Sequence, residues 1–238
     1  MSEPARPQGR LLAVLAGKAQ PFGPRGEPSG IVKAPCRQAV CIGTLGLSGD
    51  EQGDRRHHGG PEKAVHHYAF EHYGQWKREL PANGEHFDRP GTFGENFSSL
   101  GMSEANVCIG DVFRAGTAVL EVSQGRQPCW KLDTRTGLRG MAARVQQSGR
   151  TGWYYRVLGP GSVREGDALE LLRRPNPNWP LARLLHYMYV DMLNGDALAE
   201  IAALPPLARS WRHVAETRLR RNVVEDWSGR LHPPESIQ

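Results

Sequence analysis

Long hydrophobic runs are absent from this sequence, and the apolar stretch at residues 11–16 is too short for a signal peptide or a membrane span. Cysteine is also scarce. Four cysteines in a chain of 238 residues do not form a disulfide framework, so we expect a reducing, cytoplasmic location. The chain further lacks a G-x-G-x-x-G motif after a predicted strand and a cysteine cluster for an iron–sulfur centre. We therefore do not expect it to collect electrons from NADH by itself.

Glycine and proline, by contrast, are abundant, with 28 and 18 residues. Such a composition favours many turns and short strands over a helical bundle. Hydrophobic residues make up 39% of the chain and charged residues 23%, which is typical of a globular protein and not of a disordered one. The net charge of +5 suits an anionic ligand or a nucleic acid and does not choose between them.

Residues 11–172 alternate short apolar strands with irregular loops. We expect strands at 11–15, 31–33, 38–42, 107–114, 118–123, 153–158 and 162–171, a long loop at 17–30, and helices at 69–80 and about 138–147. Two Gly-Asp pairs, at 110–111 and 166–167, predict bends between strands. The pattern favours a closed or partly closed β-barrel over alternating βαβ units, so the predicted fold is mainly β with flanking helices.

The composition changes at residues 173–180, a proline-rich linker between the predicted barrel and a helical unit at 181–227. Three helices are expected there, with Gly195 capping the first and Asp196 beginning the second, and with residues 1–10 as a loose arm and 228–238 as a frayed tail. The third helix has a basic face, made of Arg209, Arg212, Arg218, Arg220 and Arg221. Such a face can bind nucleic acid, but charged helix faces are usually only solvated, so a nucleic-acid partner is not favoured.

One cysteine follows a proline in the stretch 123–132 (SQGRQPCWKL) and has two cations nearby, Arg126 and Lys131. Positive charge favours the thiolate of Cys129, which is the form that attacks electrophiles or ligates metals. The alternative is a small buried hydrophobic side chain, as most free cysteines are. Cys36 and Cys41 have a C-x4-C spacing that fits packing better than a zinc site.

The densest polar stretch covers residues 46–68. It contains four histidines within eleven residues, His57, His58, His66 and His67. Their spacing matches no zinc motif, and we favour an anion-binding loop made by His58, Gly59, Gly60 and Lys63. A solvated turn capped by Asp50 is the alternative. Farther along, Glu95 is either a general acid or base or a carboxylate that accepts backbone N–H bonds.

Five segments in this order resemble the MOSC domain, named for the C-terminal part of molybdenum cofactor sulfurases. They are GLSGD at 46–50, HGGPEKA at 58–64, FGEN at 93–96, IGD at 109–111 and RQPCWKL at 126–132. The trailing helices are similar to the 3-alpha domain of the bacterial YiiM subgroup. The resemblance covers about residues 10–225, nearly the whole chain.

The resemblance implies a MOSC β-barrel whose cleft receives the molybdenum cofactor, a metal-binding pterin with a phosphate. On this analogy Cys129 would ligate molybdenum and is the central catalytic residue. The expected phosphate and pterin contacts are Arg126, Lys131, Lys63, Gly59 and Gly60. His58 and Asn96 are expected to bond the pterin or to move protons. No pyridoxal phosphate is expected.

The activity that the resemblance implies is the reduction of N-hydroxylated substrates, such as hydroxylaminopurine and other hydroxylamines, to amines and water, a detoxification reaction. The electrons would come from a separate reductase partner, and a homodimer is possible. Two alternatives use the same cleft: sulfur transfer through a Cys129 persulfide, and a carrier that holds the cofactor without turnover.

Overall fold

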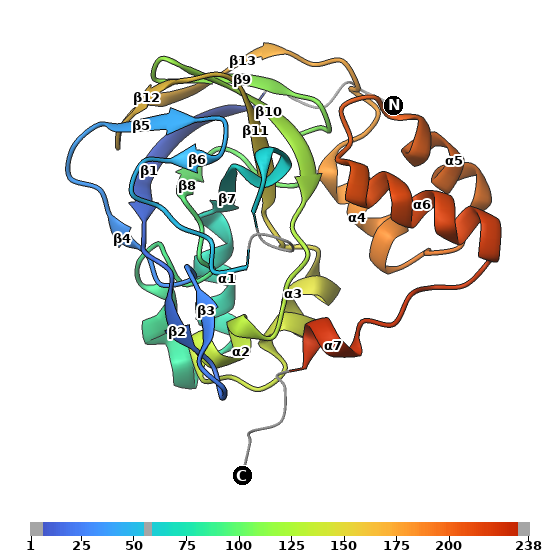
Figure 1. The fold of residues 1–238 in the computed structure, drawn as a ribbon, viewed down its shortest axis with the longest axis horizontal. Helices are drawn as coiled ribbons and strands as arrows, with labels where there is room; N and C mark the ends of the chain where they lie inside the picture. The colour runs from blue at the N-terminus through green and yellow to red at the C-terminus, as the bar shows by residue number, and fades with distance from the viewer. Residues whose placement is uncertain (1–6, 55–58, 233–238) are drawn as a thin grey trace.

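The computed structural model describes residues 7–54 and 59–232, and its centre is a closed seven-stranded barrel (Figure 1). Its strands are β1 (Gln8–Ala16), β7 (Val65–Ala69), β8 (Phe97–Leu100), β9 (Val112–Ala115), β10 (Ala118–Gly125), β11 (Trp153–Gly159) and β13 (Ala168–Arg173). They run in the order β13-β9-β10-β11-β7-β8-β1, and β1 pairs with β13 to close the ring. Only β7 and β8 are parallel among these described pairs. The predicted β-barrel is therefore confirmed, with strands and helices contributing about equally.

Two apolar cores hold the barrel and its flanking helices. The larger core fills the barrel interior and includes Phe97, Phe113 and Trp153. The smaller core lies outside the barrel wall, where Tyr68 and Phe93 stack with ring centroids 3.9 Å apart. Because successive residues of a strand face opposite sides, β7 contributes alternately to the two sides. This alternation matters for the two histidines of β7 discussed below.

Short strands and 3-10 turns lie in the connections between the barrel strands. They are β2 (Gln20–Phe22), β3 (Glu27–Ser29), β4 (Ala34–Pro35), β5 (Val40–Gly43), β6 (Gly46–Leu47), β12 (Gly161–Val163) and two 3-10 turns, η1 (Pro61–Lys63) and η2 (Pro81–Phe87). The loop predicted at 17–30 thus contains a hairpin, β2–β3, whose turn has positive φ at Gly23 and Gly26. The strand predicted at 31–33 is wrong, since this segment forms no strand among the described residues. Instead, Ile31 packs in the second core and Lys33 forms a buried ion pair with Asp50.

Three helices flank the barrel: α1 (Glu71–Glu79), α2 (Lys131–Thr136) and α3 (Met141–Ser148). The predictions at 69–80 and 138–147 correspond to α1 and α3. The short helix α2 was not predicted. It begins two residues after Cys129 and ends at Gly137, whose φ of 68° is left-handed. It therefore places the segment from Arg126 to Lys131 at the junction between a strand end and a helix start.

The helical unit consists of α4 (Leu181–Tyr189), α5 (Gly195–Ala203) and α6 (Arg209–Arg221) and lies beside the barrel (Figure 1). The predicted cap at Gly195 is wrong, since α4 ends at Tyr189, and the N-cap of α5 is Asn194, whose side chain accepts from Ala197 N at 3.0 Å. No helix in the described ranges is long enough and apolar enough to span a bilayer.

Two further predictions for the C-terminal region are corrected. Arg218 does not belong to an exposed basic face, because it is buried and bonds Glu225 and the Met188 carbonyl. Within the tail predicted at 228–238, α7 (Ser228–Leu231) is a short helix that returns to the barrel, where the Trp130 N–H donates to the Arg230 carbonyl at 2.8 Å.

The helical unit is joined tightly to the strand that carries the cysteine segment. A Cβ atom on Gly125, the last residue of β10, would lie 2.9 Å from Trp211 and 3.0 Å from Leu185. Only glycine permits this close approach of α4 and α6 to the strand. The linker is also ordered, because Arg174 donates to both carboxylate oxygens of Asp111 at 2.9 and 2.7 Å.

Candidate functional site

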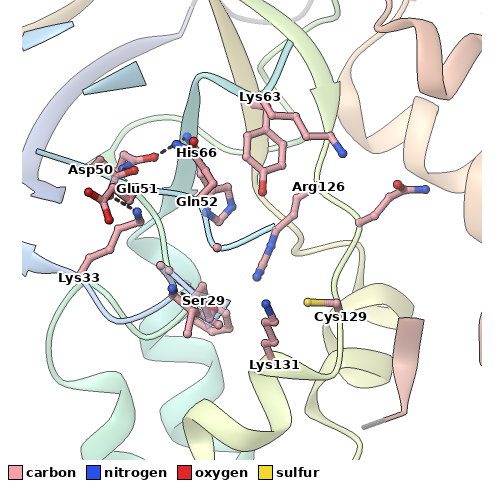
Figure 2. A pocket seen from close by; sticks show the side chains of 18 residues that line it. Ser29, Lys33, Asp50, Glu51, Gln52, Lys63, His66, Arg126, Cys129 and Lys131 are labelled. Carbon is pink, nitrogen blue, oxygen red and sulfur yellow. Dashed lines mark hydrogen bonds and ion pairs between the residues drawn. The ribbon is translucent and has the colours of Figure 1, made fainter. Parts of the chain in front are cut away.

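A cleft lies at one end of the barrel, between the segment after β3, the segment after β6 and the segment after β10 (Figure 2). It brings together residues that are far apart in the sequence. The lining side chains that carry ionisable or hydrogen-bonding groups include Lys33, Asp50, Lys63, His66, Asn96, Arg126, Cys129, Lys131 and Tyr154. Five of the predicted site residues therefore share this cleft: Lys63, Asn96, Arg126, Cys129 and Lys131.

Cys129 occupies the short connection between β10 and α2, where the chain leaves the barrel wall. Its side chain lines the cleft although the residue is only 7% exposed. Its carbonyl accepts the Leu132 N–H at 3.0 Å, and the preceding Pro128 carbonyl accepts from Arg230 of α7. The backbone around the thiol is thus held from both sides, and the sulfur faces the ends of Arg126 and Lys131 in Figure 2.

Arg126 is the most deeply buried cation of the cleft, with 6% of its surface exposed. Its backbone N–H donates to Gly152 at 3.0 Å, and its side chain bonds the hydroxyl of Tyr154. The Nη1 atom is buried and has no hydrogen-bond partner among the described residues. An unpaired guanidinium donor in the interior is costly, so it indicates a place for an acceptor that residues 7–54 and 59–232 do not supply.

Two lysines complete the positive wall. Lys131 donates to the Pro28 carbonyl at 2.8 Å, which ties α2 to the β2–β3 hairpin. Burial lowers the pKa of Lys63, while the neighbouring charges of Glu62, Asp54 and Cys129 act in the opposite direction. Cys129 is therefore one of the groups whose charge acts on Lys63.

His66 is a cleft residue that sequence reasoning did not select. It is 4% exposed, and its Nε2 atom has no partner among the described residues. Burial, and then the charge of Arg126, holds the pKa of His66 well below its ordinary value of 6.5. The ring is therefore neutral at pH 7. With a bond to the Gly94 backbone at its other nitrogen, it offers Nε2 as an acceptor toward the cleft. The sequence VHHYA of β7 has no apolar–polar alternation that would indicate this orientation, and all five residues are buried.

Asn96, in contrast, serves the framework of the site. Its side-chain oxygen accepts the His66 N–H at 3.0 Å, and its nitrogen donates to the Leu15 carbonyl at 3.1 Å and to Asp50 at 2.9 Å. Asp50 in turn accepts from Gly17 N and forms a buried ion pair with Lys33. This network fixes one wall of the cleft and leaves the Asn96 amide already bonded.

The remaining predictions lie elsewhere. His58 falls outside the described residues, and Gly59 and Gly60 are not among the described residues that line the cleft. Glu95 accepts from the N–H groups of Gly91 and Phe93, at 2.7 and 3.1 Å, which is the backbone role weighed for it. No group of three or more His, Cys, Asp or Glu side chains within residues 7–54 and 59–232 has the arrangement of a metal site.

The comparisons with known proteins agree with this architecture. Residues 54–170 match the MOSC domain, and residues 179–222 match the YiiM-like, 3-alpha helix domain. The chain is 38% identical over 220 residues to Protein YiiM of Escherichia coli (strain K12), covering 92% of this chain and 96% of that protein. It is 37% identical over 219 residues to a Gibberella moniliformis protein named Reductase, covering 91% of this chain but only 38% of the fungal protein.

A solved structure extends the agreement to the whole fold. The crystal structure of YiiM from Escherichia coli matches with a TM-score of 0.77 and 33% identity, covering 90% of this chain and 98% of that one. The two chains therefore share their overall fold. The chain belongs to the MOSC domain family, in the YiiM-like group that carries the 3-alpha helix domain.

Proposed function

We propose that the cleft binds the molybdenum cofactor through Cys129 and that the protein reduces N-hydroxylated compounds to amines. The observation that carries the proposal is one thiol in a cleft with four cationic side chains, of which Lys33 is paired with Asp50 and Arg126 keeps a buried donor unpaired among the described residues. A soft thiolate suits molybdenum, and a cationic wall suits a phosphate-bearing pterin. Membership of the MOSC family supports the same assignment.

The residues present fit such a group in both charge and hydrogen-bonding sense. Arg126 Nη1 offers a donor for a phosphate or ring oxygen, and neutral His66 Nε2 offers an acceptor for a ring N–H. Lys63 and Lys131 line the same cleft and add positive charge. A polyanion without a donor on its edge would leave the His66 acceptor unused. The cleft therefore suits a ligand that combines anionic oxygens with N–H groups.

When bound, the cofactor would supply two-electron redox chemistry at a molybdenum atom that the Cys129 thiolate ligates. Reduction of an N–OH group to an amine consumes two electrons and two protons and releases water. Lys63 is the cleft side chain suited to deliver a proton from Nζ, because burial lowers its pKa and makes the ammonium a better acid. Neutral His66 would orient a donor group of the ligand and does not act as an acid at pH 7.

The electrons would come from a separate reductase. The fungal relative named Reductase is much longer than this chain, which matches only 38% of it. The unmatched portion is a candidate for the electron-input part that this chain lacks. Turnover by the purified protein with NADH alone would contradict this part of the proposal. A cytoplasmic location stays a prediction.

The proposal is tested by metal and pterin content. Wild type, Cys129→Ala and the control Cys41→Ser, which alters an exposed cysteine, would be purified anaerobically from a host that makes the cofactor. We expect near-stoichiometric molybdenum and fluorescent oxidised pterin in wild type and in the control, and loss of molybdenum in Cys129→Ala. Absence of both from wild type, in a host whose other molybdenum enzymes are loaded, would refute the proposal.

A second assay separates an enzyme from a carrier. Loaded protein would be mixed with hydroxylaminopurine and with a simple hydroxylamine, using reduced methyl viologen as the electron donor. We expect amine formation that depends on Cys129. Bound cofactor without reduction of either compound would favour the carrier. A persulfide adduct on Cys129 by intact-mass spectrometry would favour sulfur transfer.

A further inference from the structure

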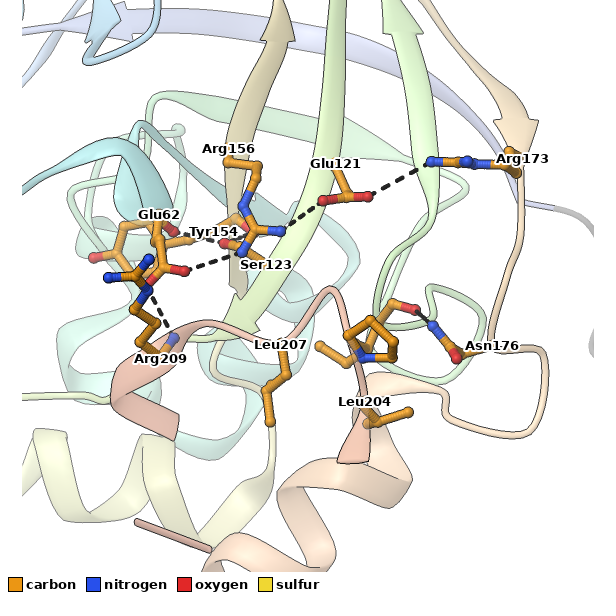
Figure 3. A network of polar contacts seen from close by, with 12 residues as sticks. Glu62, Glu121, Ser123, Tyr154, Arg156, Arg173, Asn176, Leu204, Leu207 and Arg209 are labelled. Carbon is orange, nitrogen blue, oxygen red and sulfur yellow. Dashed lines mark hydrogen bonds and ion pairs between the residues drawn. The ribbon is translucent and has the colours of Figure 1, made fainter. Parts of the chain in front are cut away.

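The turn η1 connects the cleft with the helical unit. Its last residue, Lys63, lines the cleft, and its middle residue, Glu62, turns its carboxylate toward α6 (Figure 3). The Arg209 N–H, at the first residue of α6, donates to Glu62 Oε2 at 3.0 Å. Two consecutive side chains thus join the two parts of the molecule.

The same glutamate is also bonded to the barrel. Arg156 of β11 donates to Glu62 Oε1 at 3.1 Å and to Glu121 of β10 at 2.6 Å. The Ser123 hydroxyl lies 2.6 Å from the Glu62 carbonyl. Glu62 is therefore held by β10, by β11 and by α6 at once, so its position depends on how the helical unit docks.

Helix α6 is a firm support for this contact. Its thirteen residues give its first N–H groups a partial positive charge, which favours a carboxylate at that end. Trp211, in its first turn, is fully buried and packs close to Gly125 of β10. The Ala208 N–H donates to the Ser123 carbonyl at 2.8 Å. Because apolar packing and a backbone bond already fix the start of α6, the helix can hold the turn in place.

We infer that the helical unit positions the cleft lysine: the N-terminus of α6 holds Glu62, and Glu62 fixes the turn that presents the ammonium group of Lys63 to the cleft that Cys129 also lines. Glu62 and Arg209 are positioning residues in this role, since neither needs to touch a ligand. The inference assigns the helical unit a part in the electrostatics of the cleft. Its relevance to catalysis rests on the proposed function, but the placement of Lys63 can be measured without any cofactor.

One substitution removes the contact with little other change. Arg209→Pro deletes the N–H donor, and proline is well tolerated at the first position of a helix. The residue before it, Ala208, has φ −55° and ψ 140°, a conformation that a following proline accepts. Arg209→Ala is the matched control, because it removes the exposed side chain and keeps the N–H group.

The readout is the alkylation of Cys129 in cofactor-free protein, followed by mass spectrometry of the peptide that contains it. The ratio of the rate with anionic iodoacetate to the rate with neutral iodoacetamide reports the positive potential at the sulfur. We expect Lys63→Met to lower this ratio by about tenfold and Arg209→Pro by about threefold, with Arg209→Ala equal to wild type. In a second pair, Glu62→Ala should lower the ratio below that of Glu62→Gln, which keeps an acceptor.

Three results would overturn the inference. One is a wild-type ratio in Arg209→Pro when Lys63→Met lowers it. Another is an equal loss in Arg209→Ala and Arg209→Pro, which would assign the effect to the exposed guanidinium. The third is a wild-type ratio in Lys63→Met. If circular dichroism shows that Arg209→Pro is unfolded, the comparison of Glu62→Ala with Glu62→Gln tests the inference instead, and equal ratios in these two variants would overturn it. Failure of molybdenum binding would not change any of these results, so the two proposals fail separately.

Discussion

His66 and His67 are neighbours on β7, and they face opposite sides of the strand. His67 lies in the barrel interior, where Nδ1 is 3.1 Å from the Tyr155 hydroxyl, Nε2 is 2.7 Å from Ser99 Oγ and the ring stacks on Trp153 at 4.3 Å. His66 lies in the cleft, and its Nε2 has no partner among the described residues. The interior uses both nitrogens of its histidine, whereas the cleft leaves one nitrogen available.

Two buried arginines repeat the difference. Arg174, at the junction with the helical unit, donates twice to Asp111 and once to the Asn106 carbonyl. The Arg174 side chain is 7% exposed and Arg126 is 6% exposed, yet Nη1 of Arg126 lacks a partner among the described residues. Arg174 is paired within the chain, whereas Arg126 keeps one buried donor available, as the proposed binding surface requires.

The largest expected effect is at the junction. Asp111→Ala would leave the Arg174 guanidinium buried without its carboxylate, so we expect a loss of about 3–5 kcal/mol in the free energy of unfolding. The measurement is urea unfolding at pH 7. A loss below about 1 kcal/mol would mean that the Asp111–Arg174 pair contributes no more to stability than a surface contact, which would contradict the contrast drawn between Arg174 and Arg126.

The partner substitution sharpens this prediction. Burial raises the pKa of Asp111, and hydrogen bonds from Arg174 oppose that shift. In Arg174→Met those hydrogen bonds are gone, and Asp111 can become neutral by taking up a proton. In Asp111→Ala the buried Arg174 cannot become neutral, because a guanidinium does not lose its proton. We therefore expect a smaller loss than in Asp111→Ala. Since the folded carboxyl would hold its proton more tightly than the unfolded one, the stability of Arg174→Met should fall as the pH rises through the raised pKa.

The second prediction concerns the cleft arginine. Arg126→Met removes a buried charge with an unpaired donor, so the free energy of unfolding should stay within about 0.5 kcal/mol of wild type or increase. The affinity of cofactor-free protein for inorganic pyrophosphate should fall by about tenfold to a hundredfold, the worth of a bond from a charged donor. Calorimetric titration measures the affinity. A large loss of stability with unchanged affinity would reverse the roles of Arg126 and Arg174.

Much of the fold could be predicted because its patterns are local. The two Gly-Asp bends are an example: Gly110 and Gly166 have positive φ, and Asp111 and Asp167 each accept the N–H three residues earlier, at 2.8 and 2.9 Å. The failures have tertiary causes. Residues 31–33 have a strand composition, but Ile31 is drawn into the second core. Arg218 has the spacing of an exposed face, but Glu225 beyond the helix pairs it inside.

The site was predictable only where a residue's chemistry is visible from its neighbours along the chain. Cys129, Arg126 and Lys131 share one segment, so their proximity follows from the sequence. The orphaned nitrogen of His66 depends on which side of β7 faces the cleft, and the framework role of Asn96 depends on Leu15 and Asp50 from distant segments. Glu62 gave no sign of its bond to α6, which lies 147 positions later in the chain.

The smallest expected effect returns to the two histidines. His67→Gln loses two side-chain bonds and a stacked ring, so we expect a cost of about 2 kcal/mol at pH 7. His66→Gln should cost less than about 1 kcal/mol, because its cleft nitrogen has no bond within the described chain to lose. Urea unfolding of both variants at pH 7 tests the difference, and equal costs would contradict it.

The two histidines should contribute equally to the pH dependence of stability in acid. Burial lowers the pKa of His67 to about 3 and that of His66 well below 6.5, so both are neutral when folded and both take up a proton when unfolded. The unfolded state then binds more protons, and stability falls by about 1.4 kcal/mol per pH unit for each histidine as the pH drops below 6.5. Each glutamine variant should lower this slope by the same amount, because the slope depends on the burial of the imidazole and not on its hydrogen bonds. The two sides of β7 therefore differ in stability at pH 7 and agree in their response to acid, and a slope that changed only in His67→Gln would show that water reaches His66 in the cleft.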